Sequence, residues 1–216
     1  MFTRFNEVEG FSFQEVLLCL ATMLMAFSLA ELFGRGFDHF PRIISNGELD
    51  RMLVRPRPLV PQVLVSLIEF SRLGRLVQAV LVFCYVIPAS NIHWTYDKVI
   101  TLCLMVICGS IVFFCLFLIY AAFSFFTIEG LEFMNIFTDG GREFGRYPYS
   151  IYGRDVLRFF TYIIPLALFQ YYPLLYLLGR ETSIFFMLMP LLALPFAIPA
   201  FAFWRYGLSK YKSTGS

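Results

Sequence analysis

Few residues of this sequence have the types and spacing that enzymatic chemistry requires. Glu31, Asp38 and His39 lie close together and arginines follow them, a combination that would suit an enzyme acting on lipid head groups at a membrane interface. The remaining acids are scattered, however, and His93 is the only other histidine. We therefore predict no catalytic residues and keep a membrane-embedded enzyme as the alternative interpretation.

Motifs for metals and nucleotides are also missing from the sequence. The five cysteines lie inside apolar runs, without a CxxC pair or a Cys/His cluster, so no metal site is expected. Neither GxxxxGK[ST] nor GxGxxG occurs, and the chain itself is not expected to hold ATP or another cofactor. Seventeen basic and 15 acidic residues form no basic stripe, which argues against a nucleic-acid partner.

The stretch SNGELDRMLVRPRP, residues 45–58, is unusually polar for this chain. Ser45 and Glu48 have the spacing of a capping box, which predicts a short helix from Glu48 to Val54 that ends before Arg55 and Pro56. Helical spacing places three apolar residues on one face, and charged residues surround them: Leu49, Met52 and Leu53, then Glu48, Asp50 and Arg51. Two interpretations stay open, an amphipathic helix on lipid head groups or a peg that inserts into a groove of another protein.

A second polar segment, residues 127–160, contains DGG and GRYP. Asp139-Gly140-Gly141 predicts a turn or hinge, and Arg146, Tyr147 and Pro148 predict a second turn. The favoured interpretation is an interfacial anchor made of arginines and tyrosines, and the alternative is a site for an anion or lipid phosphate: Arg142, Arg146 and Arg154, with Tyr147, Tyr149 and Tyr152.

The elements that position these segments must be membrane helices. The chain is 59% hydrophobic with 27 phenylalanines in 216 residues, more apolar surface than a small soluble core can bury. Strands of a transmembrane barrel would alternate, and no such pattern occurs, so we predict an all-α polytopic bundle in one domain over residues 1–216. The five expected spans are residues 13–33, 73–89, 99–127, 157–178 and 184–204.

Charge distribution predicts the orientation of these spans. Fourteen of the 17 Lys and Arg residues fall in segments that follow the first, third and fifth spans. The positive-inside rule then places the carboxyl tail in the cytoplasm and the amino terminus outside. Glu15 and Glu31 bracket the first span. The favoured interpretation is that they face water at its two ends, and the alternative is a buried proton or substrate site.

Three stretches together resemble one transporter family. NGELDRMLVRP after an apolar helix, EFGRYPYSIYGRDVLRFFTYIIPLALFQYYP, and the closing FWRYGLSKYKSTGS are similar to the membrane subunits of prokaryotic ABC-2 type exporters that work with a separate ATPase. The resemblance extends from Gly10 to the carboxyl end. It implies six spans, of which this chain is expected to lack the first; a truncated form, an alternative start and a natural short form all fit that expectation.

The resemblance also implies a function and partners. Residues 45–58 would be the coupling helix that docks into the ATPase, through Glu48, Leu49, Asp50, Arg51, Met52, Leu53, Arg55 and Pro56. The chain would be a non-enzymatic permease subunit in a prokaryotic cell membrane, paired with a second permease copy or a homologue, and ATP would be bound by the partner. Beside the enzyme alternative, a passive channel or an assembly scaffold stays open, and the cargo is not readable.

Overall fold

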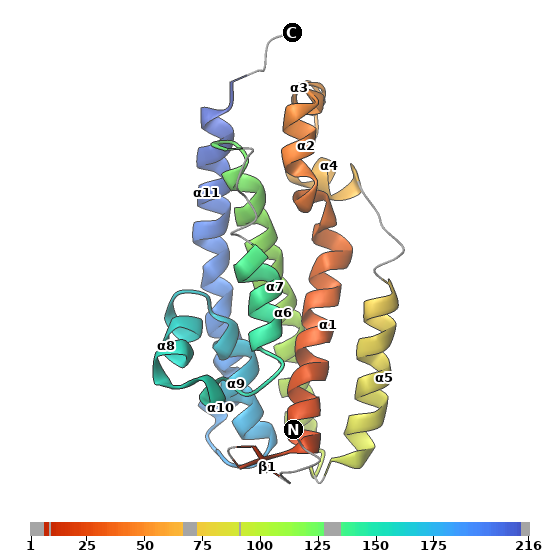
Figure 1. Cartoon of the computed structure of the whole chain (residues 1–216), viewed down its shortest axis with the longest axis vertical. Coiled ribbons are helices and arrows are strands. Elements are labelled where there is room, and N and C mark those ends of the chain that lie inside the picture. The colour runs from red at the N-terminus through yellow and green to blue at the C-terminus, as the bar shows by residue number, and fades with distance from the viewer. Residues whose placement is uncertain (1–6, 9, 67–72, 91, 128–134, 213–216) are drawn as a thin grey trace.

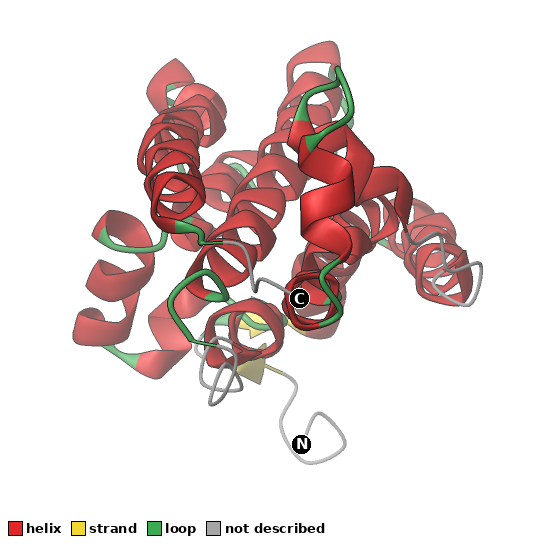
Figure 2. Ribbon diagram, turned by 90° about the horizontal axis from the view of Figure 1, so that it is seen from above, coloured by secondary structure: helices red, strands yellow, loops and turns green. Residues whose placement is uncertain are grey.

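The structure, a computed structural model, describes residues 7–8, 10–66, 73–90, 92–127 and 135–212. Its long helices lie side by side along one axis (Figure 1). A small antiparallel strand pair, β1 (Glu7–Val8) with β2 (Phe11–Ser12), lies at one end. The rest of the described chain is helical apart from its loops (Figure 2), which confirms the predicted all-α membrane bundle.

The first long helix, α1 (Phe13–Asp38), begins at a complete capping box. The Ser12 hydroxyl accepts a hydrogen bond from the Glu15 amide, and the Glu15 carboxylate accepts one from the Ser12 amide at 3.0 Å. Glu15 therefore lies in the first turn of α1, and its exposure to water at a membrane surface stays a prediction. Three short helices follow α1 at the other end of the bundle: α2 (Phe40–Ser45), α3 (Glu48–Leu53) and α4 (Leu59–Ser66).

The remaining long elements are α5 (Leu73–Ala89), α6 (Tyr96–Phe123) and a final apolar run. That run consists of α10 (Ile184–Leu188), the 3-10 stretch η4 (Met189–Phe196) and α11 (Ala197–Lys210). Among the described residues three helices are long and apolar enough to cross a bilayer, or four if one bent pair counts as a span. The 17-residue α5 has the predicted bounds but is shorter than these, so the count of five spans stays a prediction.

The fourth apolar run differs from the single helix expected over residues 157–178. It comprises α8 (Arg154–Tyr162) and α9 (Leu166–Leu177), which meet at 113°. Pro165 explains the break, because proline has no amide hydrogen and forces the residue before it out of helical geometry. Two further short elements precede it: α7 (Asn135–Phe144) and η3 (Tyr149–Tyr152).

The predicted turn at Asp139-Gly140-Gly141 is wrong, because these residues lie inside α7. Gly141 serves packing instead: a methyl group there would come within 2.8 Å of the Leu166 side chain. Two glycines in one short helix reduce its intrinsic stability, but the close contact with α9 favours glycine at position 141.

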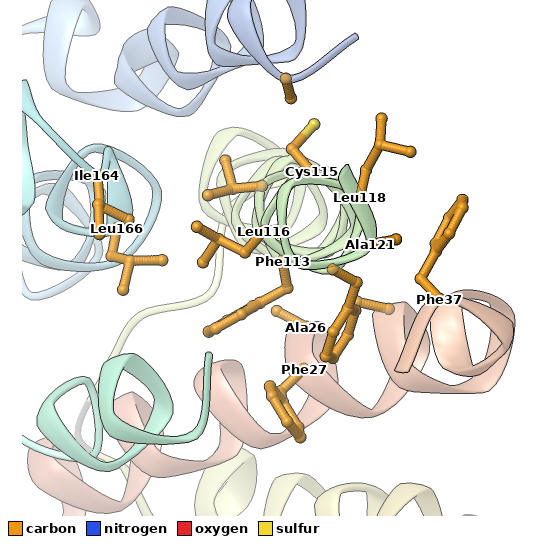
Figure 3. Packing of buried hydrophobic residues seen from close by; sticks show 14 of the residues in the cluster. Ala26, Phe27, Phe37, Phe113, Cys115, Leu116, Leu118, Ala121, Ile164 and Leu166 are labelled. Atoms are coloured by element: carbon orange, nitrogen blue, oxygen red, sulfur yellow. The ribbon is translucent and has the colours of Figure 1, made fainter. Parts of the chain in front are cut away.

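The main core surrounds α6, whose side chains reach α1, α9 and α11 (Figure 3). Phe27 of α1 meets Phe113 of α6 edge to face, with ring centroids 5.1 Å apart. Gly109 permits the closest approach, since a methyl group there would overlap both Phe169 and Ala26. The small residues of the third apolar run therefore allow close helix packing.

Candidate functional site

The predicted coupling segment lies where α3 and the carboxyl end of α11 share one end of the bundle (Figure 1). We call this the α3 end. The strand pair and the described amino terminus lie at the opposite end. This arrangement matches the alternation expected from the sequence, in which residues 45–58 and the carboxyl tail lie on one side. Which side of a membrane it faces stays a prediction.

The helix predicted within this segment is present, but it starts differently. Gly47 precedes α3, and its backbone is in the left-handed region with φ +68°. No side chain caps the helix. Ser45 is the last residue of α2, and its hydroxyl donates to the Arg42 carbonyl at 3.1 Å. The proposed Ser45–Glu48 capping box is therefore wrong, because a second short helix already uses the serine.

The residues of α3 divide into an inner and an outer set. Leu49 is 0% exposed and packs into the chain's own core. Met52 is half-buried, whereas Leu53 is 44% exposed and Val54 85% exposed. The outer set is Arg51, Leu53, Val54, Arg55 and Pro56, which we call the α3 tip; Glu48 and Asp50 are half-buried beside it.

Two contacts fix this segment to the bundle. The Gln62 amide nitrogen donates to the carbonyls of Met52 at 3.1 Å and Arg57 at 2.9 Å, which holds the proline-rich turn after α3 against α4. Gly36 of α1 lies against the Val63 backbone, and a methyl group there would overlap the Val63 carbonyl oxygen. The α3 tip is therefore exposed but carried on a well-packed base.

Aromatic and polar contacts also join this base to the last helix. Phe40 packs on Trp204 of α11, with ring centroids 4.9 Å apart, and on Phe125 at 5.2 Å. The Tyr211 hydroxyl donates to the Asp50 carboxylate at 3.2 Å. Sequence reasoning missed this link, because the two residues are 161 positions apart and no local pattern relates them.

Between α3 and α4 the surface is hollowed into a groove of about 720 Å³. Arg55 and Arg57 supply positive charge on its lining, and Met52 and Val65 supply apolar area. A groove with this lining suits an acidic protein surface that also buries an apolar side chain.

A second group of charged residues lies beside the middle of α1. Glu31, expected at a water-facing end, is instead 2% exposed and pairs with Arg75 of α5 at 2.8 Å. The helix continues to Asp38, so Glu31 falls inside it rather than at its end. The predicted position of this carboxylate is therefore corrected.

Of the three arginines expected at an interface, Arg142 is largely buried, whereas Arg146 is partly exposed and Arg154 is exposed. Arg142 of α7 is 14% exposed, and its guanidinium lies over the Phe27 ring at 4.7 Å. Arg146 pairs with Glu143 at 2.8 Å, and Tyr147 is exposed while Pro148 is buried. Tyr149 is fully buried against Phe160, so it is a core residue rather than an interfacial anchor. The role assigned to the Arg146–Pro148 turn stays a prediction.

Asp38 and His39, considered above for an enzyme, line a polar pocket of about 400 Å³ together with Arg42. The same pocket includes Asn135 and Asp139 of α7. Glu31 lies elsewhere, paired with Arg75. In the part of the chain that the structure describes, no three His, Cys, Asp or Glu side chains form a group that could hold a metal.

Comparison with known proteins gives one result that covers the whole chain. Residues 1–215 match the family model described as "ABC-2 family transporter protein". No curated protein and no solved structure matched the chain. The apolar helices described above agree with a membrane-embedded member of this family. The chain therefore belongs to the ABC-2 transporter family, as a membrane subunit for transport rather than a catalytic one.

Proposed function

We propose that this chain is a permease subunit of an ATP-driven exporter in a prokaryotic cell membrane. A separate ATPase docks at the α3 end, which faces the cytoplasm, and its nucleotide cycle drives alternating access across two permease subunits. The observation that carries the proposal is an exposed apolar tip, Leu53 and Val54, on a firmly packed base.

Docking and force transmission require different properties of the segment. The tip offers apolar and cationic groups to a partner, and the groove beside it adds Arg55 and Arg57. The base must not bend when the partner moves, and the hydrogen bonds from Gln62 and the close approach of Gly36 to Val63 provide that stiffness. Leu49 is part of the base, because its side chain is buried within this chain.

Co-purification with the ATPase tests the proposal. The permease is co-expressed with a candidate P-loop ATPase, and captured ATPase is measured after Val54→Asp and Arg55→Glu. Each change places a negative charge on the docking surface, and loss of a central interface contact typically weakens binding by about tenfold or more. Arg205→Glu, an exposed arginine of α11, is the charge-matched control and should leave capture unchanged.

Folding of each variant is checked by its elution as a single species in detergent. Equal capture by the Val54→Asp, Arg55→Glu and control chains would rule out docking through the α3 tip. ATP-dependent uptake into inverted vesicles then separates an exporter from a passive channel, since only the exporter needs the ATPase.

A further inference from the structure

The polar face of α7 lies at a depth where charged side chains are unfavourable. Arg142 packs on Phe27, which is about 21 Å along α1 from Phe13 and about 16 Å from Asp38, at 1.5 Å per residue. A hydrocarbon core is about 30 Å thick, so Phe27 lies well inside it for any reasonable placement of α1. Arg142 therefore lies within the span of the membrane.

Four charged residues follow one another along this face and into the turn after it: Asp139, Arg142 and Glu143 of α7, then Arg146 of the turn. The acids are exposed, and the arginines join them into a chain of ion pairs, with Arg142 to Asp139 at 3.3 Å, Arg142 to Glu143 at 2.9 Å and Arg146 to Glu143 at 2.8 Å. Ionised side chains inside a membrane almost always face a water-filled space or protein rather than lipid. The face is thus unsuited to acyl chains.

The backbone after α7 is interrupted at the same depth. The helix ends at Phe144, and the non-helical turn at Gly145–Pro148 packs against Met23 of α1, near the middle of that helix. Backbone of this kind is tolerated at membrane depth only where protein buries it or where it borders water. Gln170 satisfies one carbonyl by donating to Gly145 at 3.1 Å. Protein buries Gly145 and Pro148 of this turn, whereas Tyr147 between them is exposed. Substrate sites of secondary transporters are typically formed by discontinuous helices.

A mouth for such a route lies at the α3 end of α7. The polar pocket of about 400 Å³ includes Asp139, the first charge of the α7 face, together with Asn135 and Arg42. The pocket and the face are therefore continuous through one residue. The Arg75–Glu31 pair, also near Phe27, adds one positive and one negative charge, with the Arg75 guanidinium 6.0 Å from the ring.

We propose that the polar face of α7 and the turn after it form one wall of the hydrated route for cargo, and that the cargo carries a polar or zwitterionic group. The second part rests on the proposed transport function. The wall alternates in sign and has no net charge, so it solvates both signs of charge instead of attracting one. Cargo without polar groups would gain nothing from this wall.

Labelling of single cysteines tests the wall without any ATPase, so its result is independent of the proposed docking. The exposed Cys84 and Cys103 are first replaced by alanine, while the buried cysteines remain. Ile136→Cys and Tyr147→Cys then place exposed thiols at the two ends of the face. Ile107→Cys, exposed on α6 in an almost wholly apolar hollow, is the matched lipid-facing control.

Two membrane-impermeant methanethiosulfonates of similar size are compared in liposomes, one carrying a sulfonate and one a trimethylammonium group. Both should label the Ile136→Cys and Tyr147→Cys chains at least tenfold faster than the Ile107→Cys chain, and at rates within about threefold of each other because the wall is neutral. Rates at both positions no faster than the control would overturn the hydrated wall. A tenfold preference for one charge would overturn the zwitterionic cargo.

A paired charge variant provides the second measurement. Arg142→Gln with Arg146→Gln should shift the rate ratio at Ile136→Cys several-fold toward the trimethylammonium reagent, because Asp139 and Glu143 then dominate the local field. An unchanged ratio in a chain that still elutes as a single species would show that these arginines do not border the labelled space, and would also overturn the assignment.

Discussion

The Tyr211 hydroxyl donates a hydrogen bond to the Asp50 carboxylate at 3.2 Å, which joins α3 to the residue that follows α11. The Tyr211 ring also packs against Phe125, with centroids 6.1 Å apart. Asp50 therefore contributes to the base that carries the α3 tip. In the proposed mechanism, a push on α3 reaches the last helix through this link as well as through Phe40 and Trp204.

Tyr211→Phe removes the hydroxyl and keeps the ring. A hydrogen bond to a charged group contributes about 1.5–3 kcal/mol, so we expect a loss of roughly that size or less in the free energy of unfolding, measured in mixed micelles. ATPase capture should persist, because the docking surface is untouched. Permease-stimulated ATP hydrolysis should fall, because the link between α3 and the last helix is weakened. Tyr206→Phe, on the exposed side of α11, is the control. Loss of capture with normal stability would place Tyr211 in the docking surface instead.

The Glu31–Arg75 pair should behave as a coupled unit. Arg75→Met deprives a buried carboxylate of this partner, and we expect a destabilisation of about 1–3 kcal/mol, moderated by the partial exposure of Arg75. Adding Glu31→Gln removes the charge and should restore part of that stability. The measurement is a double-mutant cycle on the free energy of unfolding. Additive effects would show that the ion pair contributes no coupling.

An exposed pair of the same kind supplies the reference. Arg158 and Asp155 lie 3.7 Å apart on the surface of α8. Arg158→Met is expected to change stability by at most about 0.5 kcal/mol, because exposed pairs are screened by water. A cost equal to that of Arg75→Met would mean that burial is not the source of the difference.

Gly36→Ala tests the contact that holds α4 against α1. The added methyl group meets the Val63 carbonyl, a backbone atom that cannot rotate away. We expect a destabilisation of about 1–3 kcal/mol together with weaker ATPase capture, because α4 positions the turn after α3. Gly74→Ala on α5 meets nothing within 4 Å and should be neutral or stabilising by up to about 1 kcal/mol. Similar losses for both substitutions would exclude steric overlap as the cause.

Features that depend on interactions between residues close together in the sequence could be predicted from the sequence. Apolar length and proline positions are local, and they predicted α5 with its observed bounds and the helix of α3. The break at Pro165 has a local signal in the proline itself, although a single span over residues 157–178 was expected and the two helices meet at 113°. The Ser12–Glu15 capping box also has a local signal, because the spacing S-x-x-E occurs at residues 12–15. Both could have been predicted.

Other features depend on contacts that no local pattern encodes. The burial of Glu31 is tolerated because Arg75 arrives from α5, 44 residues later. The position of Arg142 follows from α7 folding back beside α1, where Phe27 offers an aromatic face. Leu49 shares helical spacing with Leu53, yet the base covers it and leaves Leu53 exposed. Spacing defines a helical face, but only tertiary packing decides which part of it is free.

The opposite end of the bundle is held by Arg180, which makes three contacts with the start of the chain. Its guanidinium donates to the Glu15 carboxylate at 2.8 Å and to the Gly10 carbonyl, and it lies over the Phe11 ring at 4.0 Å.

Arg180→Lys keeps the charge but loses the planar stack and the forked donors. We expect faster amide exchange in β2 and the first turn of α1, by roughly three- to tenfold, because each lost contact lowers the local opening free energy by about 1 kcal/mol. Exchange measured by mass spectrometry should leave α6 unchanged, and Arg154→Lys, an exposed arginine at the start of α8, serves as the control. Unchanged exchange at β2 would show that the Arg180 contacts do not stabilise the strand pair. Faster exchange throughout the bundle would instead reveal a role in global stability.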